Sequence, residues 1–405
     1  MLPEGWGFIK LEDIADYRRG SFPQPYGLDK WYSENGHPFV QVYDVDKNLK
    51  LKPETKSKIS DLAADQSVFV PKGTILVTLQ GSIGRVAITQ YPAYVDRTLL
   101  IIQSLKKKGD TSYLAITLQE LFAKEREKAP GGIIKTITKA VLNNFKIFWP
   151  PLPEQKKIAQ ILSTWDNAIS ATERLLENSQ QRKKALMQQL LTGKKRLPGF
   201  EGEWGSFLLS EVASVIVSPV DKKSYPEEQA VRLCNYTDVY YNARINKSMS
   251  FMEATASEAE IKKYVLKIHD VVITKDSETP GDIAVPALIN EDLGGVLCGY
   301  HLAILRSKSE KLCGPFLSYL LSMKKTRYYF FTLATGATRF GLSVGAINNA
   351  ELNLPPVMEQ KAISEILTTA DQEIDALQKR LDHLKLEKKA LMQQLLTGKR
   401  RVTLN

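Results

Sequence analysis

The chain has 405 residues, of which 43% are hydrophobic, 25% charged and 9% aromatic, and its formal net charge is +10. This length exceeds what one ordinary hydrophobic core holds, and the composition excludes an intrinsically disordered chain. No apolar run reaches the roughly 18 residues of a membrane helix, and the first residues lack the pattern of a secretory signal. We therefore expect a cytoplasmic protein with no membrane partner, and the basic surplus favours a polyanionic one.

The first region of the chain, residues 1–149, is expected to form a mixed, strand-rich α/β domain. Apolar and β-branched runs bounded by turn residues predict strands, and a helix is expected after them. The expected strands cover 39–45, 73–79, 84–89 and 98–105, and the expected helix covers 112–128.

The next region, 150–196, has the pattern of one long amphipathic helix. Pro153 and Glu154 suit a first helical turn, and Gly193 suits the left-handed position beyond the last turn. From Pro153 to Leu191 such a helix would be roughly 58 Å long. Its apolar residues follow alternating steps of three and four, which is the spacing of a coiled-coil seam, so the helix needs a second apolar stripe as its partner.

The second half of the chain repeats this order. A mixed region, 197–354, is expected to hold strands over 229–239, 270–275, 282–288 and 301–307 and a helix over 315–326. A second long helix is expected within 355–405, where Gly398 takes the place of Gly193.

An internal repeat explains why the two halves look alike. The stretch ALMQQLLTGK occurs at 185–194 and again at 390–399, and about 26 of 47 aligned positions are identical between 150–196 and 355–401. A fainter likeness pairs 73–88 with 269–284. The chain is therefore a doubled unit, and the simplest partner for each long helix is the other copy. Two unrelated core helices are the alternative, which the matched seam lysines Lys183 and Lys388 disfavour.

The two ends of the chain suggest how these helices are arranged. The C-terminal GKRRVTLN resembles the start of the linker GKKRLPGFEGEWG, and the N-terminal LPEGWG resembles its end, so the sequence is nearly circular. We predict an α+β protein in which two mixed α/β domains related by pseudo-two-fold symmetry are separated by two long helices in an antiparallel coiled coil. The predicted seam consists of Ile158, Leu162, Trp165, Ile169, Leu176, Leu186, Leu190, Ile363, Leu367, Ile374, Leu377, Leu381, Leu384, Leu391 and Leu395.

Two related domains with different loops on one frame are typical of a recognition protein, because binding residues lie on loops held by a rigid scaffold. If the polyanion is duplex DNA, bases are distinguished by side chains with fixed donor and acceptor patterns. We selected loop residues that fall at similar places in both copies. The candidates are Gln41, Tyr43, Asp44, Thr78, Gln80, Ser82, Arg85, Lys135, Thr136, Lys139, Asn235, Tyr236, Asp238, Lys275, Asp276, Ser277, Thr338 and Arg339.

Catalytic and metal-binding patterns were sought and none is predicted. The chain has no phosphate-binding G-x-x-x-x-G-K-[ST] motif, no H-E-x-x-H and no C-x-x-C. The stretch NLPPV (353–357) resembles the Asn-Pro-Pro-aromatic loop of amino-methyltransferases only in part, because Leu354 separates the asparagine from the prolines. Cys234, Cys298 and Cys313 have no paired spacing, so reduced thiols are expected rather than disulfides or a zinc site.

These residues carry a resemblance to a known family. The P-P-x-x-E-Q starts at 150–155 and 355–360, the two ALMQQLLTGK-[KR]-R ends and the linker LPGFEGEW (197–204) resemble the DNA-specificity subunit of Type I restriction–modification systems. The resemblance covers essentially the whole chain. It implies target-recognition domains at 1–149 and 197–354 and conserved spacer helices at 150–196 and 355–405.

The same resemblance implies what the chain does and with what. Each recognition domain would read one half of a split site in double-stranded DNA, and the antiparallel helices would set the length of the unread gap. The chain would have no catalytic activity and no cofactor of its own. It would hold two methyltransferase subunits, which bind S-adenosylmethionine and in turn join restriction subunits.

Two other functions remain as alternatives at this point. A duplicated coiled-coil scaffold could bind two proteins and no DNA. Gel shifts of the chain with its methyltransferase partner that show no sequence-selective shift and no salt dependence of affinity would favour this scaffold. A fused nuclease or methyltransferase is the other alternative, which activity of the isolated chain on DNA with S-adenosylmethionine would support.

Overall fold

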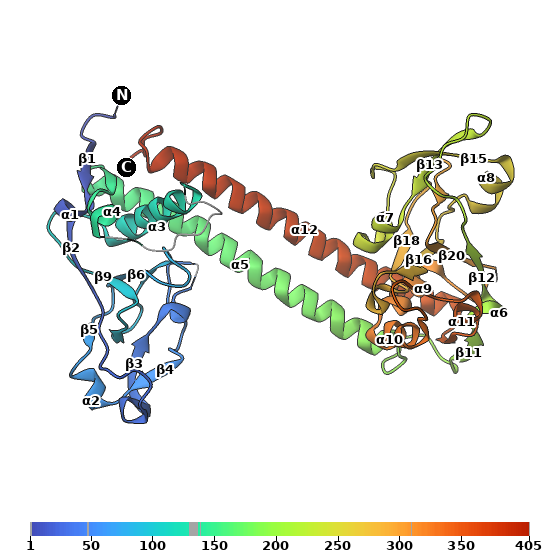
Figure 1. Cartoon of the computed structure of the whole chain (residues 1–405), viewed down its shortest axis with the longest axis horizontal. Helices are drawn as coiled ribbons and strands as arrows, with labels where there is room; N and C mark the ends of the chain where they lie inside the picture. The colour runs from blue at the N-terminus through green and yellow to red at the C-terminus, as the bar shows by residue number, and fades with distance from the viewer. Residues whose placement is uncertain (1, 47, 129–136, 138, 309, 405) are drawn as a thin grey trace. The chain divides into compact units, whose positions relative to one another are not determined.

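The computed structural model describes residues 2–46, 48–128, 137, 139–308 and 310–404. Its contacts divide the chain into two units, Met1–Arg174 with Lys379–Asn405, and Leu175–Gln378 (Figure 1). Each unit contains one mixed domain and parts of both long helices. The expected two-domain mixture of helix and sheet is thereby confirmed.

The first unit is built from two four-stranded sheets, with strand orders β2-β9-β6-β7 and β4-β3-β8-β5, and a ribbon of β1 and β10. Helix α3 packs on β7. The strands are β1 (Gly7–Lys10), β2 (Ala15–Arg19), β3 (Tyr32–Val40), β4 (Ser57–Ile59), β5 (Val68–Val70), β6 (Ile75–Thr78), β7 (Val86–Ile88), β8 (Ala93–Val95), β9 (Leu99–Leu105) and β10 (Lys146–Trp149), and the helices are α1 (Leu11–Ile14), α2 (Asp61–Ala64), α3 (Thr111–Lys128) and α4 (Lys139–Asn143).

The second unit contains a five-stranded sheet of order β12-β20-β16-β18-β14, a three-stranded sheet of order β15-β13-β19, and the ribbons β11-β22 and β17-β21. Helix α9 packs on β18 and β16 (Figure 1). The strands are β11 (Gly205–Leu208), β12 (Ala213–Val217), β13 (Gln229–Cys234), β14 (Arg244–Ile245), β15 (Met252–Ala256), β16 (Val271–Thr274), β17 (Asp276–Ser277), β18 (Pro286–Ile289), β19 (Leu297–Cys298), β20 (Leu302–Ser307), β21 (Phe340–Gly341) and β22 (Glu351–Leu354), and the helices are α6 (Leu209–Val212), α7 (Tyr236–Tyr241), α8 (Glu258–Tyr264), α9 (Gly314–Ser322), α10 (Lys324–Leu333) and α11 (Val344–Asn348).

The central strands β6 and β16 are apolar up to a final threonine because both faces of their sheets are covered. In β16, Val271 and Ile273 belong to the core beneath α9, whereas Val272 belongs to a second core on the opposite face. The first unit repeats this alternation, with Ile75 on one face of β6 and Leu76 on the other. Successive side chains of a strand point to opposite faces, so a continuous apolar run is what such a sheet requires.

Two expected strands end earlier than the sequence suggested. The runs 39–45 and 229–239 were expected to be strands throughout, but β3 ends at Val40 and β13 ends at Cys234. A short helical turn, η2 (Val42–Asp44), follows the first, and α7 follows the second. In both, an aspartate three residues after the cap accepts the cap's backbone N–H, and this side-chain hydrogen bond favours a helical turn over further strand.

A third expectation also needs correction. The helix expected over 315–326 is interrupted, because Met323 adopts φ −66° and ψ 141° and separates α9 from α10. The expected helix over 112–128 is confirmed as α3.

The two long helices are α5 (Leu152–Leu190) and α12 (Val357–Leu395), within one residue of the expected bounds of the first. Gly193 and Gly398 have φ of 69° and 72°, as predicted for the position beyond the last turn. A Cβ at Gly193 would lie 3.3 Å from the Trp204 ring, and a Cβ at Gly398 would lie 2.8 Å from the Pro3 ring. The backbone conformation and the packing therefore both favour glycine at each of these positions.

Within each unit, segments of α5 and α12 lie together and run in opposite directions. In the first unit, Asp166 pairs with Lys388 at 2.5 Å, and Glu173, further along α5, pairs with Lys385, which precedes Lys388. In the second unit, Ser179 bonds Glu373 at 2.9 Å, and Lys183 pairs with the earlier Asp371. All fifteen predicted seam residues are buried or half-buried.

The Glu-Gln pair of each P-P-x-x-E-Q segment bonds the first turn of its long helix to other parts of the chain. Glu154 and Glu359 are buried and accept hydrogen bonds from Arg401 and Arg196, respectively. The neighbouring glutamines accept a backbone N–H from the domain, Asp110 for Gln155 at 2.8 Å and Cys313 for Gln360 at 2.9 Å. The repeated Glu-Gln pair thus attaches the start of each helix to a chain segment distant in sequence.

None of the helices in the described residues combines the length and the apolar character that crossing a lipid bilayer requires.

Candidate nucleic-acid interface

A strand-to-helix turn begins the candidate site in the second unit. Asn235 caps α7, and its backbone N–H donates to the Asp238 carboxylate at 2.8 Å. This turn presents three tyrosines of α7 on one side. Tyr236 and Tyr240 stack with ring centroids 5.6 Å apart, and Tyr241 is 76% exposed.

A buried threonine shapes the next loop. Thr274 lies at the end of β16, where its hydroxyl donates to the Asp282 carbonyl at 2.6 Å and accepts the Val285 N–H at 2.9 Å. These two hydrogen bonds hold the residues between Thr274 and Val285 as a loop, and β17 in this loop pairs with β21. That pairing places Phe340 opposite Ser277 and so brings the 335–341 segment to the same place.

These loops enclose a cleft of about 420 Å³ in the second unit. It holds four of the predicted residues, Tyr236, Asp276, Ser277 and Arg339. The other predicted residues, Asn235, Asp238, Lys275 and Thr338, adjoin these in the chain without lining the cleft. Its full lining is Tyr236, Thr237, Tyr240, Tyr241, Asp276, Ser277, Glu278, Thr279, Asp282, His301 and Arg339.

The cleft carries acidic, basic and aromatic groups in fixed positions. Asp276 pairs with Lys275 at 2.6 Å and with His301 Nδ1 at 3.1 Å. Tyr240 donates its hydroxyl to Asp282 at 2.9 Å, and this hydrogen bond raises the pKa of Tyr240, so the phenol stays a donor at neutral pH. Such a mixed lining offers hydrogen-bond acceptors and donors at set places, which is what distinguishing base edges requires.

The first unit has a corresponding cluster at the end of β3. The Gln41 amide donates to the Tyr26 hydroxyl at 2.5 Å and accepts from the Tyr43 hydroxyl. Tyr26 in turn donates to Asp96 at 3.0 Å, and burial followed by this carboxylate raises the pKa of Tyr26. The Arg97 guanidinium lies 5.7 Å from the Tyr26 ring centroid.

Two predicted residues do not offer their side chains to a ligand. Asp44 is fully buried, accepts the backbone N–H groups of Gln41 and Lys56, and serves as a turn cap. Thr78 is also fully buried, and its hydroxyl holds the following loop by donating to the Ser82 carbonyl at 2.5 Å, as Thr274 does in the second unit. The prediction that these two contact DNA does not fit their burial, because direct contact requires an accessible polar atom.

The remaining predicted residues of the first unit are placed as follows. Gln80 and Ser82 are exposed on the loop after β6, and Arg85 is half-buried with Nη1 3.4 Å from the Val45 carbonyl. Lys135 and Thr136 lie outside the described residues, and Lys139 is described only as the first residue of α4.

Sequence reasoning missed several residues of both clusters. These are Tyr26, Asp96 and Arg97 in the first unit and Tyr240, Asp282 and His301 in the second, and within each cluster they come from segments separated by tens of residues. One local signal was available, since N-Y-T-D and Q-V-Y-D share the Asn/Gln-x-x-Asp cap spacing that begins a helical turn. In the described residues no group of three His, Cys, Asp or Glu side chains could hold a metal ion.

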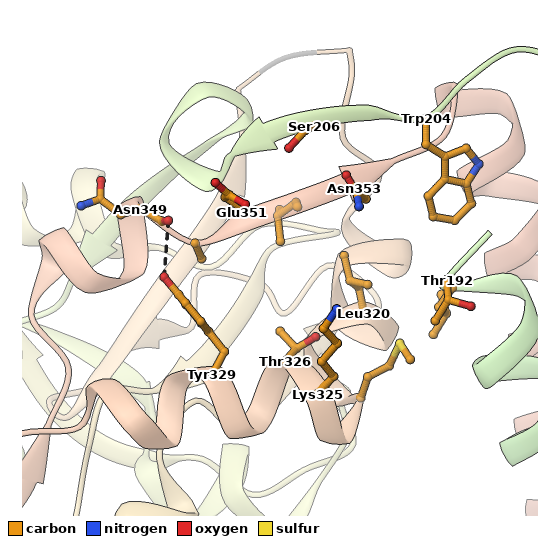
Figure 2. A pocket seen from close by; sticks show the side chains of 14 residues that line it. Thr192, Trp204, Ser206, Leu320, Lys325, Thr326, Tyr329, Asn349, Glu351 and Asn353 are labelled. Carbon is orange, nitrogen blue, oxygen red and sulfur yellow. Dashed lines mark hydrogen bonds between the residues drawn. The ribbon is translucent and has the colours of Figure 1, made fainter. Parts of the chain in front are cut away.

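A second hollow of the second unit, of about 510 Å³, lies between α9 and α10 on one side and the β11-β22 ribbon on the other (Figure 2). Trp204 and Thr192 border one end, and Tyr329 donates its hydroxyl to the Asn349 carbonyl at 3.4 Å. None of the predicted DNA-contacting residues lines this hollow, so it is distinct from the candidate interface.

Comparison with known proteins gives similar relatives over the whole length. The chain is 26% identical to the Type I restriction enzyme MjaVIII specificity subunit of Methanocaldococcus jannaschii, over 99% of this chain and 94% of that one. It is 20% identical to the Type I restriction enzyme StySPI specificity subunit of Salmonella potsdam, over 98% and 88% of the two chains.

Solved structures share the fold. The crystal structure of a Type I restriction–modification system S subunit from M. genitalium matches with a TM-score of 0.59 at 16% identity, covering 96% of both chains. A chain from a structure describing complex assembly and conformational transition of the Type I system matches with a TM-score of 0.56 at 17% identity, covering 98% of this chain and 99% of that one.

The family model described as the Type I restriction modification DNA specificity domain matches twice, at residues 3–178 and 201–386. The two matches correspond to the two copies of the sequence repeat, and together they span most of the chain. The chain therefore belongs to the Type I restriction modification DNA specificity domain family.

Proposed function

We propose that this chain is the non-catalytic DNA-specificity subunit of a Type I restriction–modification complex, and that each of its domains reads one half of a bipartite DNA site. The observation that carries this function is the doubled match to the DNA specificity domain, with a different set of polar loop residues in each copy. The domain boundaries we propose are 1–149 and 197–354 for recognition, with 150–196 and 355–405 as spacers.

The cleft of the second domain supports base reading rather than phosphate binding alone. Carboxylates such as Asp276 and Glu278 repel phosphates but accept hydrogen bonds from the amino groups of cytosine and adenine. Arg339 supplies the opposite pattern, which suits guanine. Phosphate contacts would come from other basic residues and would orient the domain without selecting sequence.

The long helices form the spacer in this proposal. In each unit the polar contacts between α5 and α12 follow opposite directions along the two helices, and the seam residues are buried or half-buried. An antiparallel coiled coil continuous along both helices accounts for these contacts. Such a rod would relate the domains by a pseudo-two-fold axis and keep the unread gap constant.

The partners follow from the family. Two methyltransferase subunits would bind along the spacer, supply S-adenosylmethionine and methylate the site, and restriction subunits would join through them. The complex would act on chromosomal DNA in the cytoplasm. A scaffold without DNA specificity is the outcome that the following experiment would reveal.

Mapping of methylated bases in a host with and without the gene tests the proposed function. We expect one bipartite motif to be methylated only when the gene is present. Exchanging residues 1–149 for the matching region of a relative is expected to change one half of that motif and leave the other half intact. A motif that is unaffected by deletion of the gene, or changed in both halves by the exchange, would contradict the proposal.

Replacing Tyr241 by alanine is expected to lower the affinity of the complex for its site about tenfold, because an exposed ring that lines the cleft can pack against base edges and sugars of the duplex. The unfolding midpoint of the chain should not change, because the Tyr241 side chain is mostly exposed. Tyr225→Ala is the matched control, since Tyr225 is an exposed tyrosine of the same domain that does not line the cleft. Equal effects of the two substitutions in electrophoretic mobility shifts would exclude a specific role for Tyr241.

A further inference from the structure

A polar network in the second unit joins the recognition domain to both long helices. The Tyr319 hydroxyl on α9 donates to the Asp371 carboxylate on α12 at 2.6 Å. Arg244 on β14 donates to Tyr319 at 2.7 Å and to the Thr368 hydroxyl at 3.1 Å. Lys183 on α5 forms an ion pair with the same Asp371. We call these five residues the Asp371 network.

The chemistry of the network favours one fixed geometry. Tyr319 is 8% exposed, and burial together with its hydrogen bond to Asp371 raises its pKa to about 12, so the hydroxyl stays a donor at neutral pH. The Lys183 ammonium also lies 5.6 Å from the Tyr319 ring centroid. Hydrogen bonds to an ionised carboxylate are strong and directional, whereas apolar contacts between a domain and a helix tolerate small rotations.

The first unit provides an internal comparison for α9. Asp110 and Cys313 donate equivalent backbone N–H groups to Gln155 and Gln360. Ile116 follows Asp110 at the same distance in the chain as Tyr319 follows Cys313, so Ile116 occupies the place of Tyr319. Isoleucine has no hydroxyl, and Ile116 belongs instead to an apolar cluster. In the described part of the first unit, this position of α3 therefore supplies no hydrogen bond to a carboxylate of the long helices.

The same comparison applies to β14. Leu288 donates its N–H to the Ala243 carbonyl, and Ile88 donates its N–H to the Leu49 carbonyl. Lys50, which follows Leu49, therefore occupies the place of Arg244, which follows Ala243. Lys50 is exposed, and in the described residues Asp166, the counterpart of Asp371, has Lys388 as its hydrogen-bonding and ion-pair partner. Among the described residues, the first unit thus keeps the bond between the two long helices at this position, and neither Ile116 nor Lys50 bonds to the Asp166 carboxylate.

We propose that Tyr319 and Asp371 are positioning residues that fix the angle of the second recognition domain on the helix pair. In the described residues, Ile116 and Lys50 of the first domain make no corresponding bond to Asp166. This inference rests on the proposed function in one respect, which is its consequence for DNA. A fixed second domain would hold its half-site at one helical phase, so the network would narrow the range of gap lengths that the protein accepts.

Pulsed electron paramagnetic resonance on the full-length chain tests the positioning role without DNA. Spin labels would be placed at Ser248→Cys in the domain and Asp375→Cys on α12, both exposed, in a Cys313→Ala background. We expect a narrow distance distribution in the parent, and a broader one after Tyr319→Phe, which removes only the hydroxyl. Tyr319→Ile, which installs the residue of the first unit, should broaden it as well.

Asp166→Asn is the matched control, because it removes the counterpart carboxylate from the other unit. It should leave the distribution in the second unit unchanged. An unchanged distribution in both Tyr319 variants would overturn the positioning role, and equal broadening by Asp166→Asn would assign the effect to general loosening of the helix pair.

Binding of the methyltransferase complex to duplexes then tests the consequence. The probes carry the motif identified by methylation mapping, with its natural gap or with one base pair more or fewer. Tyr319→Phe is expected to reduce the preference for the natural gap about tenfold, the equivalent of one hydrogen bond to a charged group, with half-site preferences unchanged. An unchanged gap preference overturns the consequence. If the parent complex selects no bipartite site, the proposed function fails, while the distance distributions still decide whether the network positions the domain.

Discussion

Replacing Arg196 by alanine is expected to lower the unfolding midpoint of the chain by on the order of 10 °C. The Glu359 carboxylate is fully buried, and its two oxygens accept hydrogen bonds from Arg196 Nε and Nη2, each at 2.7 Å. In the described residues Arg196 is the only side-chain partner of Glu359. Removing it leaves a buried charge without compensation, which is among the most costly single changes in a folded protein.

The duplicated chain supplies a matched control for this change. Arg401 pairs with Glu154 in the first unit, but Glu154 also accepts a hydrogen bond from Trp6 Nε1 at 3.2 Å. The corresponding Nε1 of Trp204 has no hydrogen-bond partner in the part of the chain that is described. Arg401→Ala should therefore lower the midpoint less than Arg196→Ala, as measured by calorimetry.

A surface ion pair sets the baseline for the same measurement. Lys385 and Glu173 are 49% and 41% exposed, so Lys385→Ala should change the midpoint little. If Arg196→Ala had no more effect than Lys385→Ala, the burial of Glu359 would not matter for stability. A double replacement of Arg196 and Glu359 by methionine should recover most of the loss, because it removes both charges together.

Insertion of four residues after Ser179 is expected to change the gap between the two half-sites and leave the half-sites themselves unchanged. An α-helix rises 1.5 Å per residue, so the insertion adds about 6 Å, which is roughly two base pairs of DNA. We expect the preferred gap to lengthen by about one or two base pairs and the affinity for the original site to fall at least about a hundredfold. Methylation mapping and binding to duplexes of varied gap measure both effects.

An insertion elsewhere separates this effect from general damage. Four residues added after Ser248, in an exposed turn of the second domain, lengthen the chain without lengthening either spacer helix. The preferred gap should then stay the same. A change in the bases of either half-site after the Ser179 insertion would contradict the division of the chain into readers and spacer.

The long helices were predictable because their signals are local. Steps of three and four between apolar residues, a first-turn glutamate and a glycine beyond the last turn each act within a few residues, and α5 and Gly193 match them. The duplication was also visible directly, since identical residues at 185–194 and 390–399 need no structure to be compared. The apolar strands at 73–79 and 270–275 were found because both faces of their sheets are covered.

The boundaries and the site were less predictable because they depend on competing or distant contacts. Asp44 and Thr78 are polar residues in loops, a pattern shared by ligand contacts and by structural caps, and only burial shows that both are structural. The helix break at Met323 has no glycine or proline to announce it.

Local periodicity, composition and the repeat thus establish the doubled architecture, the two helices and the family resemblance, because each is written within short stretches of chain. Other features join residues that are distant in the chain. Arg196 and Glu359 are 163 positions apart, and Tyr319 and Asp371 are 52 positions apart. Tyr236, Asp276 and Arg339 meet around one cleft from separate segments. No periodicity encodes such pairs. They arise only when the packed core brings distant segments within hydrogen-bond distance of each other.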